Sequence, residues 1–334
     1  MVVISYLLQI LFHEIGHMLA GVLTGWRLLF LQFFHVVLKK DKSISLSIVP
    51  SSACRCIMSP KTLKCNSQLY TLGGLIVNLM ITSISFYSML SAGYHVIQFL
   101  IAMCLFSSGI ALIMINGVPR INHICNDMAC FLLTRSNRST MLSHNNQFII
   151  AEHLTRGKSY CEIDYERFEV AAYTEINDIT AYSILLKFYY HMNRDEFMTA
   201  KNTLLSIKGF NKVSKNVQGI YKLELFYLYM ILSIYGYDSF QSSVLPHGDE
   251  EEQYLIENTA IGDVHVYRVK AIYATFTRIR ECDINGAKES LYSCLHILKS
   301  MPCIYPGEKL FCEDQLGAIL NMLNRRMAIE EVVL

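Results

Sequence analysis

Acidic residues are nearly missing from the first part of this 334-residue chain. Glu14 and Asp41 alone precede Asp127, although the whole chain has 28 acidic residues. Charged residues make up 17% of the sequence, against about 25% in an ordinary soluble domain. This shortage excludes a chain that lies wholly in water. It predicts that the first third is embedded in a membrane and that the rest is an ordinary globular protein.

The sequence also lacks a surplus of positive charge and a paired set of metal-binding cysteines. The formal net charge of +1 gives no reason to expect a nucleic-acid partner. The 11 cysteines have no repeated spacing, and Cys54 and Cys56 have no second pair that would complete a zinc clip. We therefore expect reduced thiols. A basic n-region is missing as well, so we expect the first apolar segment to remain in the mature protein.

Three segments are long and apolar enough to cross a bilayer as helices, which takes about 20 residues. They run over about residues 2–23, 69–92 and 96–115. Lysines and arginines gather between the first and second segments and again after the third. The positive-inside rule then predicts a multi-pass protein of the cell membrane with its N-terminus outside and its C-terminal region in the cytosol.

The link between the first two spans has a different character. Residues 31–37 and 43–49 are rich in valine, isoleucine and phenylalanine, and the charged residues 39–42 separate them. This pattern favours a small β-hairpin near the membrane face over a simple loop.

The C-terminal part has the helical periodicity of a soluble α-helical hairpin array. Ala200 and Ala287 resemble the small packing residues of tetratricopeptide-like hairpins, and the acidic residues 249–252 indicate a solvated loop or helix start. The expected fold class is mostly α, with residues 1–135 as a membrane core and residues 139–334 as a cytosolic tetratricopeptide-like domain. The predicted helices of this domain cover residues 182–190, 197–207, 218–234, 264–280 and 285–299.

The central motif is the pentapeptide from His13 to His17, with the sequence HEIGH. Residues i and i+4 share one face of a helix, so His13 and His17 can both bind one Zn²⁺ ion. Glu14 lies close enough to act on the attacking water as a general base. Gly16 would leave room for a substrate backbone. Ionisable groups inside a spanning helix cost about 2.5–3.5 kcal/mol, which favours a functional site over polar residues that merely bridge helices.

Zinc hydrolases usually have three protein ligands, so a third ligand is expected. Asp127 is the favoured candidate because it is the carboxylate nearest the end of the third span. Pro119 should end that helix and turn the chain back toward the site. His123 and Cys125 are chemically acceptable alternatives.

The second span opens with Gly73 and Gly74, followed one turn later by Asn78. The glycines allow close backbone packing or a bend. Asn78 has two interpretations: it holds the substrate backbone or polarises the scissile carbonyl, or it forms a polar bridge between helices.

These motifs together resemble the site-2 protease family of intramembrane zinc metalloproteases, which includes sporulation factor proteases of bacteria. HEIGH is similar to the family's HExxH helix, and Gly73, Gly74 and Asn78 are similar to its G-x-x-x-N segment. Asn116, Pro119 and Asp127 are similar to the N-x-x-P…D-G element that supplies the third zinc ligand, although Met128 stands where the family usually has glycine. The resemblance covers roughly the first 135 residues. It implies cleavage of peptide bonds in or near a membrane segment.

The sequence therefore predicts an intramembrane zinc metalloendopeptidase that acts on a membrane-embedded protein or peptide precursor. The helical domain is expected to recruit a cytosolic protein partner. One alternative is a non-catalytic membrane receptor or regulator on a protease-derived fold, which would not need Glu14. Another is a metal transporter or sensor, which predicts further metal ligands along the second and third spans.

Overall fold

The computed structural model describes residues 1–40, 44–49, 53–119, 125–170, 175–207, 209–237 and 263–333. The chain divides into two compact units. The first comprises Met1–Glu152 and Val170–Thr180, and the second comprises His153–Glu169 and Ala181–Leu334. The division therefore falls later in the chain than the boundary at residues 135–139 that the sequence suggested.

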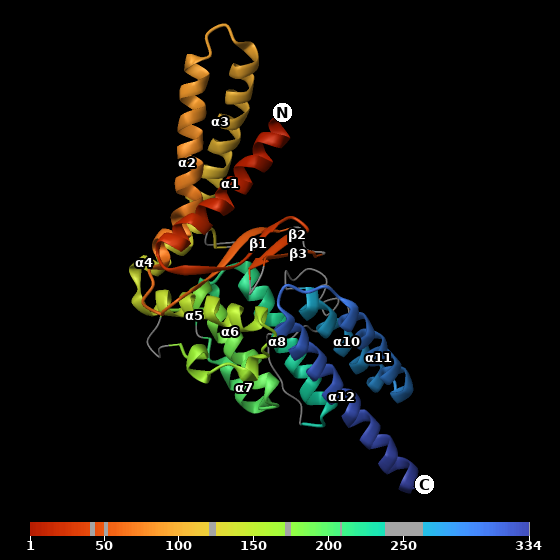
Figure 1. The fold of residues 1–334 in the computed structure, drawn as a ribbon. Helices are drawn as coiled ribbons and strands as arrows, with labels where there is room; N and C mark the ends of the chain where they lie inside the picture. Colours follow the sequence, from red (N-terminus) through yellow and green to blue (C-terminus); the bar gives the residue numbers. More distant parts are fainter. Residues whose placement is uncertain are drawn as a thin grey trace. The chain divides into compact units, whose positions relative to one another are not determined.

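Three long apolar helices build one part of the first unit: α1 (Val2–Leu23), α2 (Ser67–Ser91) and α3 (Val96–Gly117). Each is long and apolar enough to cross a membrane, and their bounds agree closely with the three expected spans. Figure 1 shows α2 and α3 side by side, with α1 leaning across them. Helix α1 packs against both.

The three helices are polar inside and apolar outside, which is the reverse of a soluble protein. Gln9, His13, Asn78 and Thr82 are buried between the helices. Large apolar side chains cover the outside, including Val3, Leu19, Leu79, Ile84, Leu90, Ile97 and Met114. Such an outer surface suits lipid and would be unfavourable in water. The chain is therefore membrane-associated.

A fourth helix, α8 (Lys215–Ile234), also meets the criteria of length and hydropathy for a membrane span. It belongs to the second unit, and 72% of its apolar stretch is buried inside the protein, against 28–44% for the other three helices. Its apolar side chains therefore already have protein neighbours and form the core of the second unit.

A four-stranded antiparallel sheet belongs to the first unit, with the strand order β3-β2-β1-β4. The strands are β1 (Trp26–Phe33), β2 (Val36–Lys40), β3 (Ile44–Ile48) and β4 (Cys54–Pro60). The expected hairpin is present as β2 and β3, with Val36 opposite Ile48. The expected first strand over residues 31–37 was wrong, because a turn at Phe34 (φ 52°) divides it between β1 and β2. Asp41 and Lys42 of the charged turn lie outside the described residues.

Helices α4 (Asp127–Ser136) and α5 (Arg138–Thr155) complete the helical part of the first unit. Trp26 stacks on Tyr70 with ring centroids 4.5 Å apart, and Phe148 of α5 meets both rings edge-on. The Asn145 side chain donates hydrogen bonds of 3.0 Å to the carbonyls of Leu63 and Cys65. These contacts join the sheet, the start of α2 and α5 around one small core.

The second unit is helical. The helices predicted in the C-terminal part are all present, and Ala200 and Ala287 are fully buried, as expected for packing residues. The acidic residues 249–252 lie outside the described part of the chain. Besides α8, the described elements of this part are η1 (Tyr160–Glu162), η2 (Tyr165–Phe168), α6 (Asp178–Asn193), α7 (Phe197–Leu205), η3 (Phe210–Lys212), α10 (Asp263–Arg280), α11 (Ile284–Ser300) and α12 (Pro306–Val333).

One ion pair is completely buried in the second unit. Arg268 of α10 donates to both carboxylate oxygens of Glu224 in α8, at 2.5 and 2.6 Å, and neither side chain is exposed. The Tyr189 hydroxyl donates to the same carboxylate, and the guanidinium of Arg268 lies 4.0 Å from the centre of the Tyr227 ring. The pair therefore joins two core helices.

Candidate metal centre

His13 and His17 occupy successive turns on the buried face of α1, and their rings meet the Asp127 carboxylate at the start of α4. Asp127 Oδ2 lies 2.9 Å from His13 Nε2 and 3.3 Å from His17 Nε2. The two imidazole Nε2 atoms are 3.1 Å apart. Among the described residues, this is the one cluster of three or more potential metal ligands whose ligand atoms converge. The structure thus brings together three residues that are far apart in the sequence.

The spacing and chemistry of these three atoms fit a zinc ion. Ligands at about 2.0–2.1 Å from a tetrahedral zinc lie about 3.3 Å from one another, close to the three separations found here. Asp127 Oδ2 is also buried, and its close polar neighbours among the described residues are the two imidazole Nε2 atoms. A buried lone pair of this kind is expected to face a ligand. The donor set therefore fits a divalent cation.

Helix α2 holds both imidazoles from behind. His17 Nδ1 lies 2.8 Å from the carbonyl oxygen of Tyr70, and His13 Nδ1 lies 3.2 Å from Asn78 Nδ2. A carbonyl can only accept, so His17 carries its proton on Nδ1 and leaves the Nε2 lone pair free for a cation. Gly74 lies between these two contacts on α2. A Cβ atom there would come within 2.5 Å of His13 Cε1 and 2.6 Å of His17 Nε2.

Asp127 reaches the histidines because the start of α4 is tied to the end of α3. The helix ends at Gly117, and Val118 is extended, as the residue before Pro119 should be. The Asn126 side chain then donates to the carbonyls of Ile115 and Val118, at 2.8 and 2.7 Å. Its Oδ1 also caps α4 by accepting from the Ala129 N–H. One asparagine therefore ties the end of α3 to the start of α4.

The charge state of Asp127 also suits a metal ligand. Burial alone would raise the pKa of its carboxyl, but the His13 and His17 imidazoles outweigh that effect and hold the pKa below its ordinary value. The carboxylate is therefore ionised at neutral pH. That is the form that binds a cation.

Gly16 has a different role from the one that the sequence suggested. A Cβ atom at Gly16 would collide with the backbone of Gly73, and a Cβ at Gly73 would collide with Gly16 in turn. The missing side chains let α1 and α2 touch backbone to backbone. The space beside Gly16 is thus filled by α2 and is not open to a substrate.

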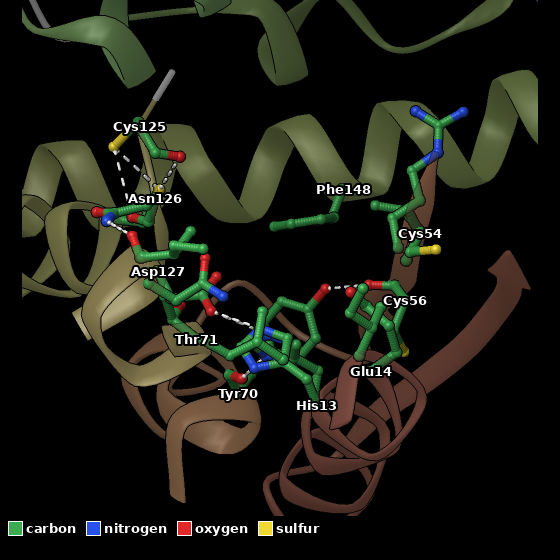
Figure 2. A pocket seen from close by; sticks show the side chains of 18 of the residues that line it. His13, Glu14, Cys54, Cys56, Tyr70, Thr71, Cys125, Asn126, Asp127 and Phe148 are labelled. Carbon is green, nitrogen blue, oxygen red and sulfur yellow. Dashed lines mark hydrogen bonds and ion pairs between the residues drawn. The ribbon is translucent and has the colours of Figure 1, made fainter. Parts of the chain in front are cut away.

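A pocket of about 640 Å³ opens beside the three ligand atoms. Figure 2 shows Asp127 on one side and Glu14 with Cys56 on the other, with His13 between them. Glu14 lies close enough to interact electrostatically with both histidines and Asp127, and its carboxylate meets the backbone N–H of Cys56 in edge strand β4. The walls come from α1, β4, α2, the end of α3, the start of α4 and α5, and include Cys54, Arg55, Ile57, Thr71, Asn116, His144 and Phe148.

The other residues considered for the site have different positions. Cys125 lines the same pocket, but its thiol lies 3.1 Å from the Cys130 Sγ and is not part of the converging group. His123 lies outside the described residues. Asn78 is fully buried, contacts His13 and is not part of the pocket lining.

Four residues of the site were missed in the sequence. Tyr70 acts through its main-chain carbonyl, which no side-chain pattern reveals. His144 and Phe148 belong to α5, a helix that is not among those expected from the sequence. Asn126 did carry a signal, since an asparagine directly before a short helix is a typical N-cap.

Comparisons with protein-family models, with curated proteins and with solved structures found no match for this chain. The functional argument therefore depends on the residues of the site itself.

Proposed function

We propose that this protein is an intramembrane zinc metalloendopeptidase, which hydrolyses peptide bonds in or near the membrane segment of a substrate protein or peptide precursor. The observation that carries this proposal is the convergence of His13, His17 and Asp127 inside a membrane-type helix bundle, with Glu14 in the same pocket. The proposed kinship with site-2 proteases depends on the same residues.

His13, His17 and Asp127 would hold the zinc ion, and two imidazoles with one carboxylate are a usual zinc set in hydrolases. When bound, zinc supplies Lewis-acid polarisation of the scissile carbonyl and of the attacking water. Glu14 takes a proton from that water and delivers it to the nitrogen of the leaving amine. The buried position of Glu14, 8% exposed, keeps this proton transfer away from bulk water.

The position of the pocket favours a peptide substrate from the membrane. His17 lies six residues before the end of α1, about 9 Å at 1.5 Å per residue. The site therefore lies in the half of the bundle nearest β1 and β4. A helical substrate has its backbone groups bonded internally, so its scissile bond must unwind before hydrolysis.

The proposed orientation places the sheet and the second unit in the cytosol and the N-terminus of α1 outside. Arg27, Lys39, Lys40 and Arg55 all belong to the sheet that follows α1. The connection between α2 and α3 at the opposite end carries no lysine or arginine. This asymmetry is what the positive-inside rule requires. The second unit is proposed to recruit a cytosolic protein partner.

The test compares Glu14→Gln with the unchanged full chain, purified in detergent and reconstituted with a panel of single-span membrane peptides. Glu14→Gln should retain bound zinc and lose about 10²–10⁴-fold in turnover, because only the proton transfer is removed. His17→Ala should lose both zinc and turnover. Glu162→Gln, in the second unit, is the matched carboxylate control and should change neither. Processing by Glu14→Gln at the normal rate would show that Glu14 is not the base and that the proposed mechanism is wrong.

A further inference from the structure

Asn78 is the polar side chain of α2 that meets a proposed metal ligand. Its side chain is fully buried, and its amide lies 3.2 Å from His13 Nδ1. The other amide atom is buried without a hydrogen-bond partner among the described residues. Asn78 does not line the pocket, and the contact that it makes beside the pocket is with His13.

The tautomer of His13 decides which amide atom faces the ring. A neutral imidazole has one N–H group and one lone pair, and a cation at Nε2 uses the lone pair. The proton must then be on Nδ1, and the atom opposite Nδ1 must accept a hydrogen bond. The oxygen and nitrogen of an amide have nearly the same shape, so their assignment follows from the hydrogen-bond network. The metal-binding tautomer therefore requires Asn78 Oδ1 opposite His13 Nδ1.

His17 is held in the same way, but by a main-chain carbonyl oxygen, which cannot be confused with a nitrogen. The carbonyl oxygen of Tyr70 faces His17 Nδ1 at 2.8 Å and can only accept. Tyr70 and Asn78 are eight residues apart, about two turns of α2. Helix α2 thus meets both imidazoles from one face, with a main-chain acceptor behind His17 and a side-chain amide behind His13.

We propose that Asn78 is a positioning residue, which accepts a hydrogen bond from the Nδ1–H of His13 and so fixes the tautomer and ring orientation that present Nε2 to the cation. This inference rests on the proposed metal site. It gives Asn78 no contact with the substrate or the scissile carbonyl. Acceptors behind histidine ligands typically contribute 10–100-fold to metal affinity.

The test measures zinc affinity of the purified full chain by competition with a chelator. Asn78→Leu has a similar size but no acceptor, and should bind zinc 10–100-fold more weakly. Asn78→Asp keeps an acceptor and should bind zinc at least as tightly as the unchanged chain. Thr82→Val is the packing control, because Thr82 is buried one turn further along α2 and bonds only its own helix at the Asn78 carbonyl. It should leave the affinity unchanged.

A second readout uses Co²⁺ in place of zinc. The visible absorption of bound Co²⁺ should change in Asn78→Leu and stay close to that of the unchanged chain in Thr82→Val. With saturating zinc, turnover by Asn78→Leu should largely return, whereas the loss of a substrate contact would persist. Equal zinc affinities for Asn78→Leu and the unchanged chain would overturn the positioning role alone. An unchanged chain that binds no zinc would overturn the metal site and this inference together.

Discussion

His144 is a buried histidine in the wall of the pocket beside the proposed zinc ligands. It belongs to α5, and its ring meets that of Phe148 edge-on with centroids 4.8 Å apart. Its Nδ1 atom has no hydrogen-bond partner in the described part of the protein. Burial lowers the pKa of His144 from 6.5 to about 4, because the charged form loses its hydration.

This shift predicts how stability depends on pH. The unfolded chain binds a proton at His144 below about pH 6.5, whereas the folded chain does so only near pH 4. The free energy of unfolding should therefore fall as the pH drops from 6.5 to 4, by on the order of 3 kcal/mol, and show no further loss from this residue at lower pH. Thermal melting of His144→Leu should have a flatter pH dependence over this range. An identical pH dependence in both proteins would contradict the prediction.

The residues of the site could be predicted to different degrees. His13 and His17 follow from helix geometry alone, because residues four apart share a face. Asp127 could be proposed by its chemistry, but its position depends on the hydrogen bonds of Asn126 to the end of α3. The Tyr70 carbonyl could not be predicted, because every residue has one and its position depends on how α1 and α2 cross.

At the scale of elements, the contact of α1 with α2 determines where the imidazoles lie. Gly16, Gly73 and Gly74 remove the side chains that would separate the two helices. The backbone of α2 then lies directly against the rings of His13 and His17. The glycines in the sequence indicated close packing, but they did not indicate which helix would fill the space.

Gly74→Ala should therefore disturb the site as well as the packing. Its Cβ would lie 2.5 Å from His13 Cε1, and such overpacking typically costs about 1–3 kcal/mol. We expect a lower melting temperature and weaker zinc binding. Gly317→Ala in α12 is the control, since a Cβ there meets nothing within 4 Å, and it should be neutral or stabilising by up to about 1 kcal/mol. Normal zinc binding by Gly74→Ala would contradict this prediction, because it would show that the contact between α1 and α2 tolerates a methyl group.

The sheet shows why strands were harder to predict than helices. Strand β1 is an almost continuous apolar run, which gives no clear period. The turn between β1 and β2 has Phe34 in the left-handed region, where glycine or asparagine would normally mark a turn. Strand β4 contains two cysteines and an arginine and has weak strand character in the sequence. Its assignment depends on pairing with β1.

At the scale of the whole molecule, the two units are stabilised by different means. The helices of the first unit bury polar side chains and expose apolar ones, as lipid requires. The second unit buries an apolar core, and its one described ion pair with both partners fully buried joins α8 to α10. Composition indicates a similar contrast, since acidic residues are nearly missing before Asp127. The position of the boundary along the chain could not be predicted, because it cuts through α5, a single continuous helix.

The buried pair of the second unit gives a stability prediction. Arg268→Leu should lower the free energy of unfolding by about 3–5 kcal/mol, because Glu224 would remain as an uncompensated buried charge. Arg268→Met combined with Glu224→Leu should recover most of that loss, since no charge then remains buried. Chemical denaturation followed by circular dichroism measures both effects. A double variant as unstable as Arg268→Leu would show that the lost contacts with Tyr189 and Tyr227 matter more than the unpaired charge.

The position of helix α5 matters for the design of truncated fragments of this protein. His144 and Phe148 close one side of the pocket, yet the last turn of the same helix, from His153 onward, is counted with the second unit. A fragment that ends at residue 135 would keep all three proposed zinc ligands and lose this wall. Such a fragment would expose the bound ion to solvent from a side that the intact chain covers. A short fragment could therefore still bind the metal and yet fail to exclude water from the reaction. Metal binding alone would not show that such a fragment is active.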